Sequence, residues 1–322
     1  MKVDIAIMTI REDEFDAILQ RFKPRPYHQA GKRSYGLCNV QTREGWNYSV
    51  AIARCSEQGN DTSHKLASDM MRDLDPQILL VVGIAGGMPH DEFTLGDVIV
   101  STRIHNLNVG KQNEDGTMTF NIQGGIHPRI SDITGNLPLY RNRLAGWNSP
   151  TSIGQERPDL DPKRVVVGGS ADWRKQVQES LAWHFDTRQD RLPEFKTGPI
   201  ASSNHLIRNP LTLNRWRDIA RATLAVEMES AGVYEAAQGI DRQYPVLAIR
   251  GISDIVGLER DKRWTAYACQ TAAAFTHAFI RCGVLAGPPR RGISRRAAIL
   301  MGLGTGVVVS SLGLAWWHKE HE

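Results

Sequence analysis

The sequence of 322 residues has few cysteines, little excess charge and no internal repeat. Its four cysteines form no CxxC pair and no metal-type spacing with the ten histidines, so we expect reduced thiols, no metal site and no cofactor. The formal charge is only +4, and much of the excess lies in the arginines of residues 290–296, which argues against a nucleic-acid partner. The hydrophobic and charged fractions are those of a folded domain.

One long run without charge stands out, at residues 297–317. It is long enough to span a bilayer as a helix. Gly302, Gly304 and Gly306 suit close helix–helix contact, and the two terminal tryptophans suit a membrane interface. Because arginines precede the run, the positive-inside rule places the rest of the chain in the cytoplasm. We therefore predict a single-pass protein of the inner membrane. A buried core helix is the alternative.

Apolar runs and helical patterns alternate along the remaining chain, which is typical of an α/β fold. Continuous apolar runs predict buried strands at 3–8, 78–82, 95–100 and 246–249. Shorter strands are expected at 37–40, 48–52, 198–202 and 224–226. Helical spacing predicts helices at 15–22, 64–74, 171–184, 211–221 and 264–280. Residues 106–162 are rich in Gly, Asn, Pro and Arg, so we expect an irregular insert with one helix near 130–143.

Three short motifs each follow a predicted strand: GIAGG at 83–87, EME at 227–229 and RGISD at 250–254. Ligands of α/β sheets bind outside the carboxyl ends of the strands, so we expect the motifs to meet at one edge. Gly86 and Gly87 would let backbone N–H groups approach a ligand closely. A tight turn is the alternative for the glycines.

Three acidic residues in these motifs need explanation. Glu227 and Glu229 interrupt an apolar stretch where a strand passes into a helix, and burying an unpaired carboxylate is costly. A sugar diol would supply the missing hydrogen bonds, whereas a place at a helix N-terminus is the alternative. Asp254, beside Ser253, is predicted to be a buried acid with a raised pKa. A helix N-cap is its alternative.

The combination of motifs is more specific than its parts. VVGIAGG, LGDVIVST, AVEMESAGVYEAA and VLAIRGISD together resemble the nucleoside phosphorylase and nucleosidase superfamily, which includes uridine phosphorylase and methylthioadenosine/S-adenosylhomocysteine nucleosidase. The resemblance covers residues 3–282. It implies a three-layer α/β/α sandwich around a mixed twisted sheet, and a homo-oligomer. The expected order is a catalytic domain at 1–282, a basic linker at 283–296, a transmembrane helix at 297–317 and a tail at 318–322.

The resemblance also implies roles for single residues. Glu229 corresponds to the carboxylate that binds the ribose hydroxyls, with Met228 beneath the sugar and Glu227 in the same substrate-binding group. Asp254 corresponds to the general acid at purine N7, and Ser253 orients it.

Two further positions follow from the same resemblance. Glu14 falls where nucleosidases keep the carboxylate that activates water, with Glu12 as the neighbouring alternative. Leu206 and Ile207 align with the segment that stacks on the base, where Asn204 replaces the usual acidic residue.

Hydrolysis is favoured over phosphorolysis, because residues 56–63 and the glycine motif lack the arginines that the phosphorylases usually supply. Arg54 is the only nearby candidate. Basic side chains in and beside the insert could instead hold the phosphates of a nucleotide: Lys111, Arg129, Arg141, Arg143, Lys163 and Arg164.

We therefore expect a membrane-anchored purine nucleosidase that acts on adenine nucleotides or nucleosides, ATP among them. Its architecture also resembles nucleosidase effectors of bacterial antiphage defence. A phosphorylase, or a methylthioadenosine nucleosidase of purine salvage, is the first alternative. A catalytically silent nucleotide sensor that acts through its membrane helix is the second.

Overall fold

The computed structural model describes residues 1–108, 110–112, 118–120, 127–187, 190–204, 222–239 and 243–285. Leu206, Ile207, the expected helix at 211–221, the linker and the uncharged run at 297–317 lie outside these ranges. Within the described ranges, no helix is both long enough and apolar enough to cross a membrane.

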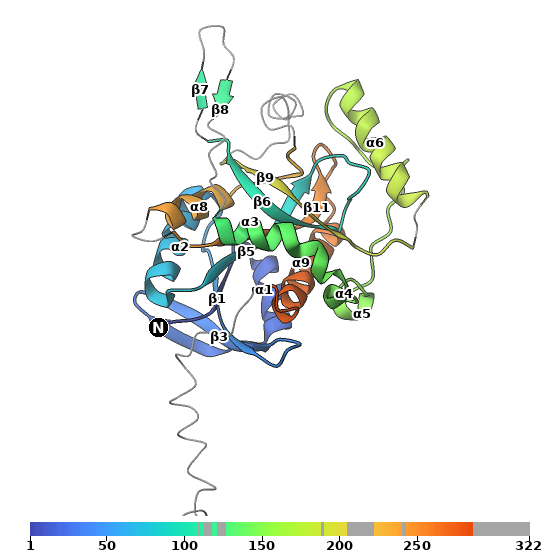
Figure 1. The fold of residues 1–322 in the computed structure, drawn as a ribbon. Coiled ribbons are helices and arrows are strands. Elements are labelled where there is room, and N and C mark those ends of the chain that lie inside the picture. The colour runs from blue at the N-terminus through green and yellow to red at the C-terminus, as the bar shows by residue number, and fades with distance from the viewer. Residues whose placement is uncertain are drawn as a thin grey trace, which may run out of the picture.

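A mixed sheet forms the centre of the described chain (Figure 1). Its nine strands lie in the order β10-β9-β6-β11-β5-β1-β4-β3-β2. Their bounds are β1 Ile5–Thr9, β2 Arg25–Ala30, β3 Arg33–Gln41, β4 Asn47–Arg54, β5 Ile78–Gly87, β6 Val98–Asn106, β9 Phe195–Ser202, β10 Ala225–Glu227 and β11 Val246–Ile255. Strands β4, β1, β5 and β11 run parallel, whereas β6 is antiparallel to β11 and β3 to β4. The expected mixed α/β sheet is confirmed.

One end of this sheet closes on itself. Strand β10 pairs in parallel with β9 and antiparallel with β5, so β10, β9, β6, β11 and β5 form a ring of hydrogen-bonded neighbours. A small separate hairpin, β7 (Gly110–Gln112) with β8 (Met118–Phe120), projects from the body (Figure 1).

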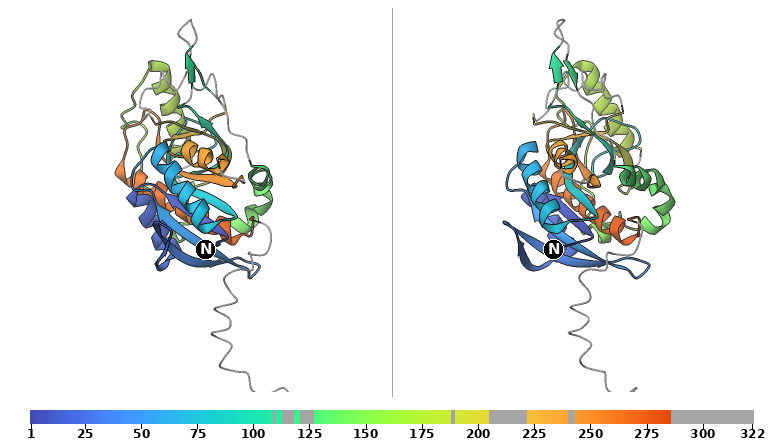
Figure 2. Two further views of the ribbon diagram at one scale, coloured as in Figure 1. Left: turned by 90° about the vertical axis from the view of Figure 1, so that its left-hand side faces the viewer. Right: turned by 60° about the vertical axis from the view of Figure 1, so that its left-hand side comes forward.

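Helices cover both faces of the sheet (Figures 1 and 2). Helices α1 and α9 pack together on one face, and α2 packs against α8 on the other. The helix bounds are α1 Glu12–Phe22, α2 Asn60–Leu74, α3 Pro128–Asn136, α4 Arg141–Leu144, α5 Pro150–Ile153, α6 Ala171–Phe185, α8 Ser230–Gln238 and α9 Lys262–Arg281, with a 3₁₀ turn η1 at Leu137–Tyr140. Every residue of β1 and β5 is buried between these layers, as their continuous apolar runs predict.

Three details differ from the predictions. Strand β2 was not expected, because Pro24 and Pro26 mark a break; Pro26 is tolerated because β2 is an edge strand. Strands β5 and β11 run on through GIAGG and RGISD, so these motifs lie within strands and the glycine turn is wrong. The helix expected near 130–143 is divided at η1, where Pro138 cannot continue an α-helix.

Candidate active site

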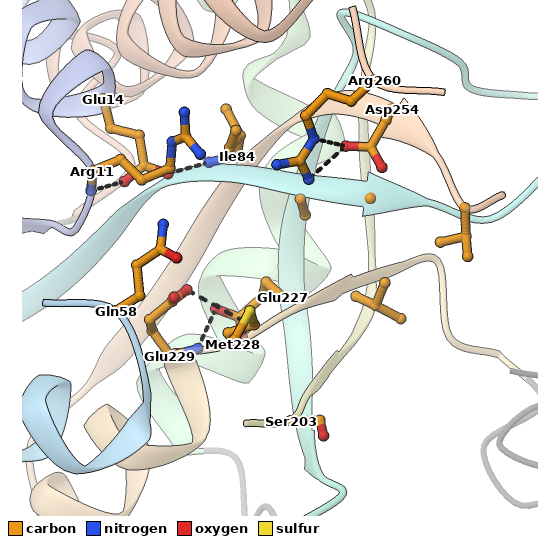
Figure 3. Close-up of a pocket in the computed structure, with 14 residues that line it drawn as sticks. Arg11, Glu14, Gln58, Ile84, Ser203, Glu227, Met228, Glu229, Asp254 and Arg260 are labelled. Atoms are coloured by element: carbon orange, nitrogen blue, oxygen red, sulfur yellow. Dashed lines mark hydrogen bonds and ion pairs between the residues drawn. The ribbon is translucent and has the colours of Figure 1, made fainter. Parts of the chain in front are cut away.

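A cavity of about 220 Å³ opens where the three motifs meet (Figure 3). Its walls come from the start of α1, the segment after β4, the ends of β5 and β11, and the β10–α8 junction. The lining residues are Arg11, Glu14, Gln58, Ile84, Ala85, Gly86, Ser203, Val226, Glu227, Met228, Glu229, Asp254, Val256 and Arg260. Segments more than 200 residues apart in the chain (Glu14 and Asp254) therefore share one cavity.

A buried ion pair forms the floor beside this cavity. The side chains of Arg250 and Glu227 are 0% and 1% exposed, and the guanidinium donates to the carboxylate. Glu227 also accepts hydrogen bonds from the backbone N–H of Glu229 at 3.2 Å and from the N–H and hydroxyl of Ser230 at 3.0 and 2.9 Å. Because these donors occupy it, the Glu227 carboxylate supports the β10–α8 junction instead of offering a free acceptor to a ligand.

Glu229 is the carboxylate of this junction that remains available. Its Oε2 lies 3.9 Å from Arg250 Nη2 and accepts a hydrogen bond from the Met228 N–H at 3.3 Å. It is the N-cap residue of α8, as the helix N-terminus alternative has it, but its side chain makes no capping hydrogen bond. Burial, followed by the nearby charge of Glu227, raises the pKa of Glu229 to about 8.

Glu14 enters the cavity from the first turn of α1. Its carboxylate accepts hydrogen bonds from the N–H groups of Ile10, Arg11 and Ile84 at 3.0, 2.9 and 2.9 Å. Burial raises its pKa, while Arg250 acts in the opposite direction. Glu12 is exposed and does not line this cavity, so the geometry favours Glu14 over its neighbour.

The close approach of Glu14 to the sheet depends on a glycine. A Cβ at Gly83 would overlap both the Glu14 carboxylate and the Arg250 guanidinium. Gly86 lines the cavity, as expected, and a Cβ there would lie 3.4 Å from Asp254 Oδ2. Gly87 does not line it, and a Cβ there would lie only 2.8 Å from Ile252 Cγ2 in the core. The lining of this cavity therefore does not support the predicted approach of Gly87 to a ligand.

Asp254 lies at the other end of the cavity, within β11. One of its oxygens, Oδ1, accepts hydrogen bonds from Ser253 Oγ at 2.6 Å and from Arg260 Nε and Nη2 at 3.2 and 3.0 Å. Its side chain is 15% exposed. Asp254 is thus a half-buried acid in an ion pair with Arg260, not an isolated one. The helix-cap alternative is wrong as well, since the N-cap of α9 is Asp261.

Sequence reasoning missed the arginines of this site. Arg250 is quoted in RGISD, and an arginine directly after a buried apolar run signals a buried carboxylate partner. Arg11 and Arg260 carry no such signal, because only the fold brings them to the cavity. Of the basic residues expected to hold phosphates, Arg129, Arg141, Arg143, Lys163 and Arg164 do not line it.

Two of those basic residues have other contacts. Arg129 donates to the carbonyls of Gln77 and Leu285, and Arg143 pairs with Glu44. The prediction of a phosphate site in the insert is therefore not supported by the described residues.

Comparison with known proteins identifies the family. The family model described as "Phosphorylase superfamily" matches residues 4–281 of the chain. The chain belongs to this superfamily. Among curated proteins it is similar to the ATP nucleosidase Cap17 of Escherichia coli (strain KTE188), with 26% identity over 234 residues that cover 72% of this chain and 41% of that protein. It is also similar to a death domain-containing ATP nucleosidase of Amphimedon queenslandica, with 24% identity over 283 residues covering 85% and 47%. The chain spans less than half the length of these relatives.

Solved structures agree on the fold. A methylthioadenosine/S-adenosylhomocysteine nucleosidase from Colwellia psychrerythraea 34H, in complex with adenine, superposes with a TM-score of 0.58 at 16% identity, covering 89% of this chain and 98% of that one. Futalosine hydrolase of Helicobacter pylori gives 0.55 at 19% identity, covering 86% and 97%. At these identities the likeness establishes the nucleoside phosphorylase-like fold alone.

Proposed function

We propose that the chain is an N-glycosidase that hydrolyses the bond between a purine and ribose in nucleosides or nucleotides. The observation that carries the proposal is the convergence of Glu14, Glu229 and Asp254, from three separate elements, on one cavity. Membership of the phosphorylase superfamily and similarity to ATP nucleosidases support it.

Each carboxylate suits one part of such a reaction. Ionised Glu229 accepts hydrogen bonds from the two ribose hydroxyls, with Met228 beside the sugar. Asp254, held through Oδ1, presents Oδ2 to N7 of the base, where a proton makes the purine a better leaving group. Glu14 orients a water molecule toward C1′ as positive charge develops on the sugar. The C1′–N9 bond breaks, the water oxygen bonds to C1′, and the products are free purine and a sugar with a 1-hydroxyl.

The contacts favour water over phosphate as the attacking group. Phosphorolysis needs free cationic groups near C1′, and the arginine whose charge acts on both Glu14 and Glu229 is Arg250. Its guanidinium is already paired with Glu227 and fully buried. Isotope labelling tests this choice: in H₂¹⁸O, hydrolysis places the label on the C1 hydroxyl of the released sugar. Formation of unlabelled ribose 1-phosphate in phosphate buffer would show a phosphorylase instead.

A membrane anchor at residues 297–317 and a role in antiphage defence belong to the same proposal. The anchor rests on the uncharged run in the sequence. The defence role rests on similarity to Cap17. If the anchor is real, the full chain will stay in the membrane pellet after an alkaline carbonate wash, and replacing Val307 and Val308 with Asp will release it. Recovery of the unaltered chain in the supernatant would remove the anchor from the account.

A further inference from the structure

We infer that the end of the cavity opposite Asp254 is a subsite for the 5′-phosphates of a nucleotide, built from Arg11, Gln58 and Arg54. The inference rests on the proposed function, because it takes the base to lie at Asp254 and the ribose at Glu229. In a nucleoside, C5′ leaves the ribose on the side remote from the base. Figure 3 shows Arg11 and Gln58 on the same side of the cavity as Glu229, with Asp254 and Arg260 on the other side.

A second cavity borders the first at Arg11 and Gln58. Both residues line this second cavity of about 540 Å³, which takes in Arg54 at the end of β4 and the first turn of α1. The two cavities share these residues, so they adjoin at this point. The second has room for a chain of phosphates that the first, at about 220 Å³, does not provide.

The donors of this subsite are available. Arg11 is half-buried and held by Asp13 through Nε and Nη2, at 2.8 and 2.6 Å, and this pairing raises its pKa. Nη1 and one N–H of Nη2 remain, so the guanidinium is fixed in direction and still able to donate. Among the described residues, the Arg54 and Gln58 side chains have no hydrogen-bonding partner. An arginine and an amide at the 5′ end suit phosphate oxygens and offer nothing to an apolar 5′ substituent.

The charges of the second cavity indicate the form in which the phosphates arrive. Arg11 and Arg54 are accompanied there by four carboxylates: Glu12, Asp13, Asp16 and Glu57. A bare triphosphate would be repelled by this excess of negative charge. In the described part of the chain, no three such side chains converge to hold a metal ion by themselves. The Mg²⁺ complex of the nucleotide fits this cavity better than the bare triphosphate does. Its metal ion offsets part of the negative charge, and Mg²⁺ is held mainly by phosphates and water, with one or two carboxylates from the protein.

The test is a binding measurement that does not depend on turnover. The full chain carrying Asp254→Asn is titrated with ATP, AMP, adenosine and inorganic phosphate by calorimetry, in Mg²⁺ and again in EDTA. We expect ATP in Mg²⁺ to bind at least about tenfold more tightly than adenosine, and this preference to disappear in EDTA. Adding Arg11→Met or Arg54→Met is expected to lower the ATP-to-adenosine affinity ratio about tenfold.

Two comparisons complete the design. Lys175→Met removes one positive charge at a side chain that is 74% exposed and leaves the ratio unchanged. Glu12→Gln with Glu57→Gln is expected to restore ATP binding in EDTA. Equal affinities for ATP and adenosine, or equal losses of both in the arginine variants, would overturn the subsite. Arginine variants that lose affinity for inorganic phosphate alone would assign these arginines to a free anion. If the unaltered chain releases no base while ATP binding still depends on Arg11, the proposed reaction fails and the subsite stands.

Discussion

The guanidinium of Arg250 in β11 forms an ion pair with the carboxylate of Glu227 in β10, and both side chains are fully buried. The pair joins two strands that are not neighbours in the sheet. It also fixes the backbone at the start of α8, since Glu227 binds the N–H groups of Glu229 and Ser230. The position of Glu229, the carboxylate proposed to bind the ribose, thus depends on the ion pair behind it.

Removing one member of this pair is expected to be strongly destabilising. Arg250→Met leaves Glu227 buried without its counter-charge, which should lower the free energy of unfolding by about 3–5 kcal/mol. The double variant Arg250→Met with Glu227→Leu should recover much of that loss. Urea unfolding measures both. Arg164→Met, at an exposed pair with Asp161, serves as control and should change stability by at most about 1 kcal/mol. An unchanged midpoint in Arg250→Met would contradict the structure.

The contact between Glu14 and the sheet can be tested at Gly83. Gly83→Ala places a methyl group against Glu14 and Arg250, so the carboxylate must move away from the cavity. We expect kcat/KM for base release to fall about 100-fold. The matched control is Gly135→Ala in α3, where a Cβ meets nothing within 4 Å and activity should persist. Equal rates in both variants would show that Glu14 does not need this position.

The raised pKa of Glu229 predicts two opposite pH trends. Its pKa of about 8 lies above the ordinary 4.5, so the folded chain holds this proton more tightly than the unfolded chain. The resulting stability is complete below about pH 4.5 and is lost as pH rises through 8. Binding of the ribose hydroxyls needs the ionised form of Glu229, so kcat/KM should rise as pH rises toward and through about 8.

Glu229→Gln separates these trends from other titrations. The variant should lose the part of the pH dependence of stability that Glu229 causes, together with most of its activity. A 2′,3′-dideoxynucleoside should lack the rise in kcat/KM, because it has no hydroxyls for the carboxylate to accept from. A decline of kcat/KM between pH 6 and 8 with the ordinary substrate would contradict the role given to Glu229.

Asp254→Asn keeps the size of the side chain and removes the carboxylate. Loss of proton donation to N7 should slow base release by about 10²–10⁴-fold with little change in folding. Asp261→Asn makes the same chemical change at the N-cap of α9, where the side chain accepts from the N–H of Arg263. That control should retain its activity. Similar activities in the two variants would remove Asp254 from the chemistry.

The central strands and the meeting of the motifs could be read from the sequence because both depend on local pattern. Continuous apolar runs specify buried parallel strands, and the carboxyl ends of such strands share an edge. Strand β2 could not be read, since its proline is acceptable only because the strand lies at an edge. Leu206 and Ile207, outside the described residues, remain predictions.

The polar partners of the site were beyond sequence reasoning. Glu227 was expected to bind substrate, whereas in the structure its carboxylate is paired with Arg250, 23 positions further along the chain. Arg260 reaches Asp254 through a turn after β11, and Arg11 is directed by Asp13. Such contacts depend on side-chain direction in the folded chain, for which residue spacing gives no rule. The predicted phosphate site in the basic insert is not supported for the same reason, since Arg129 donates to backbone carbonyls outside the cavity.

The most direct test of the account is the release of free base by the full chain. The chain is incubated separately with ATP, AMP, adenosine and methylthioadenosine, with and without inorganic phosphate, beside the Asp254→Asn variant, and base is followed by chromatography. The account predicts adenine from ATP in Mg²⁺, independent of phosphate and lost in the variant. Release only from methylthioadenosine would indicate a salvage enzyme, and release only with phosphate a phosphorylase. No base from any of these purines would contradict the account and leave a nucleotide-binding sensor.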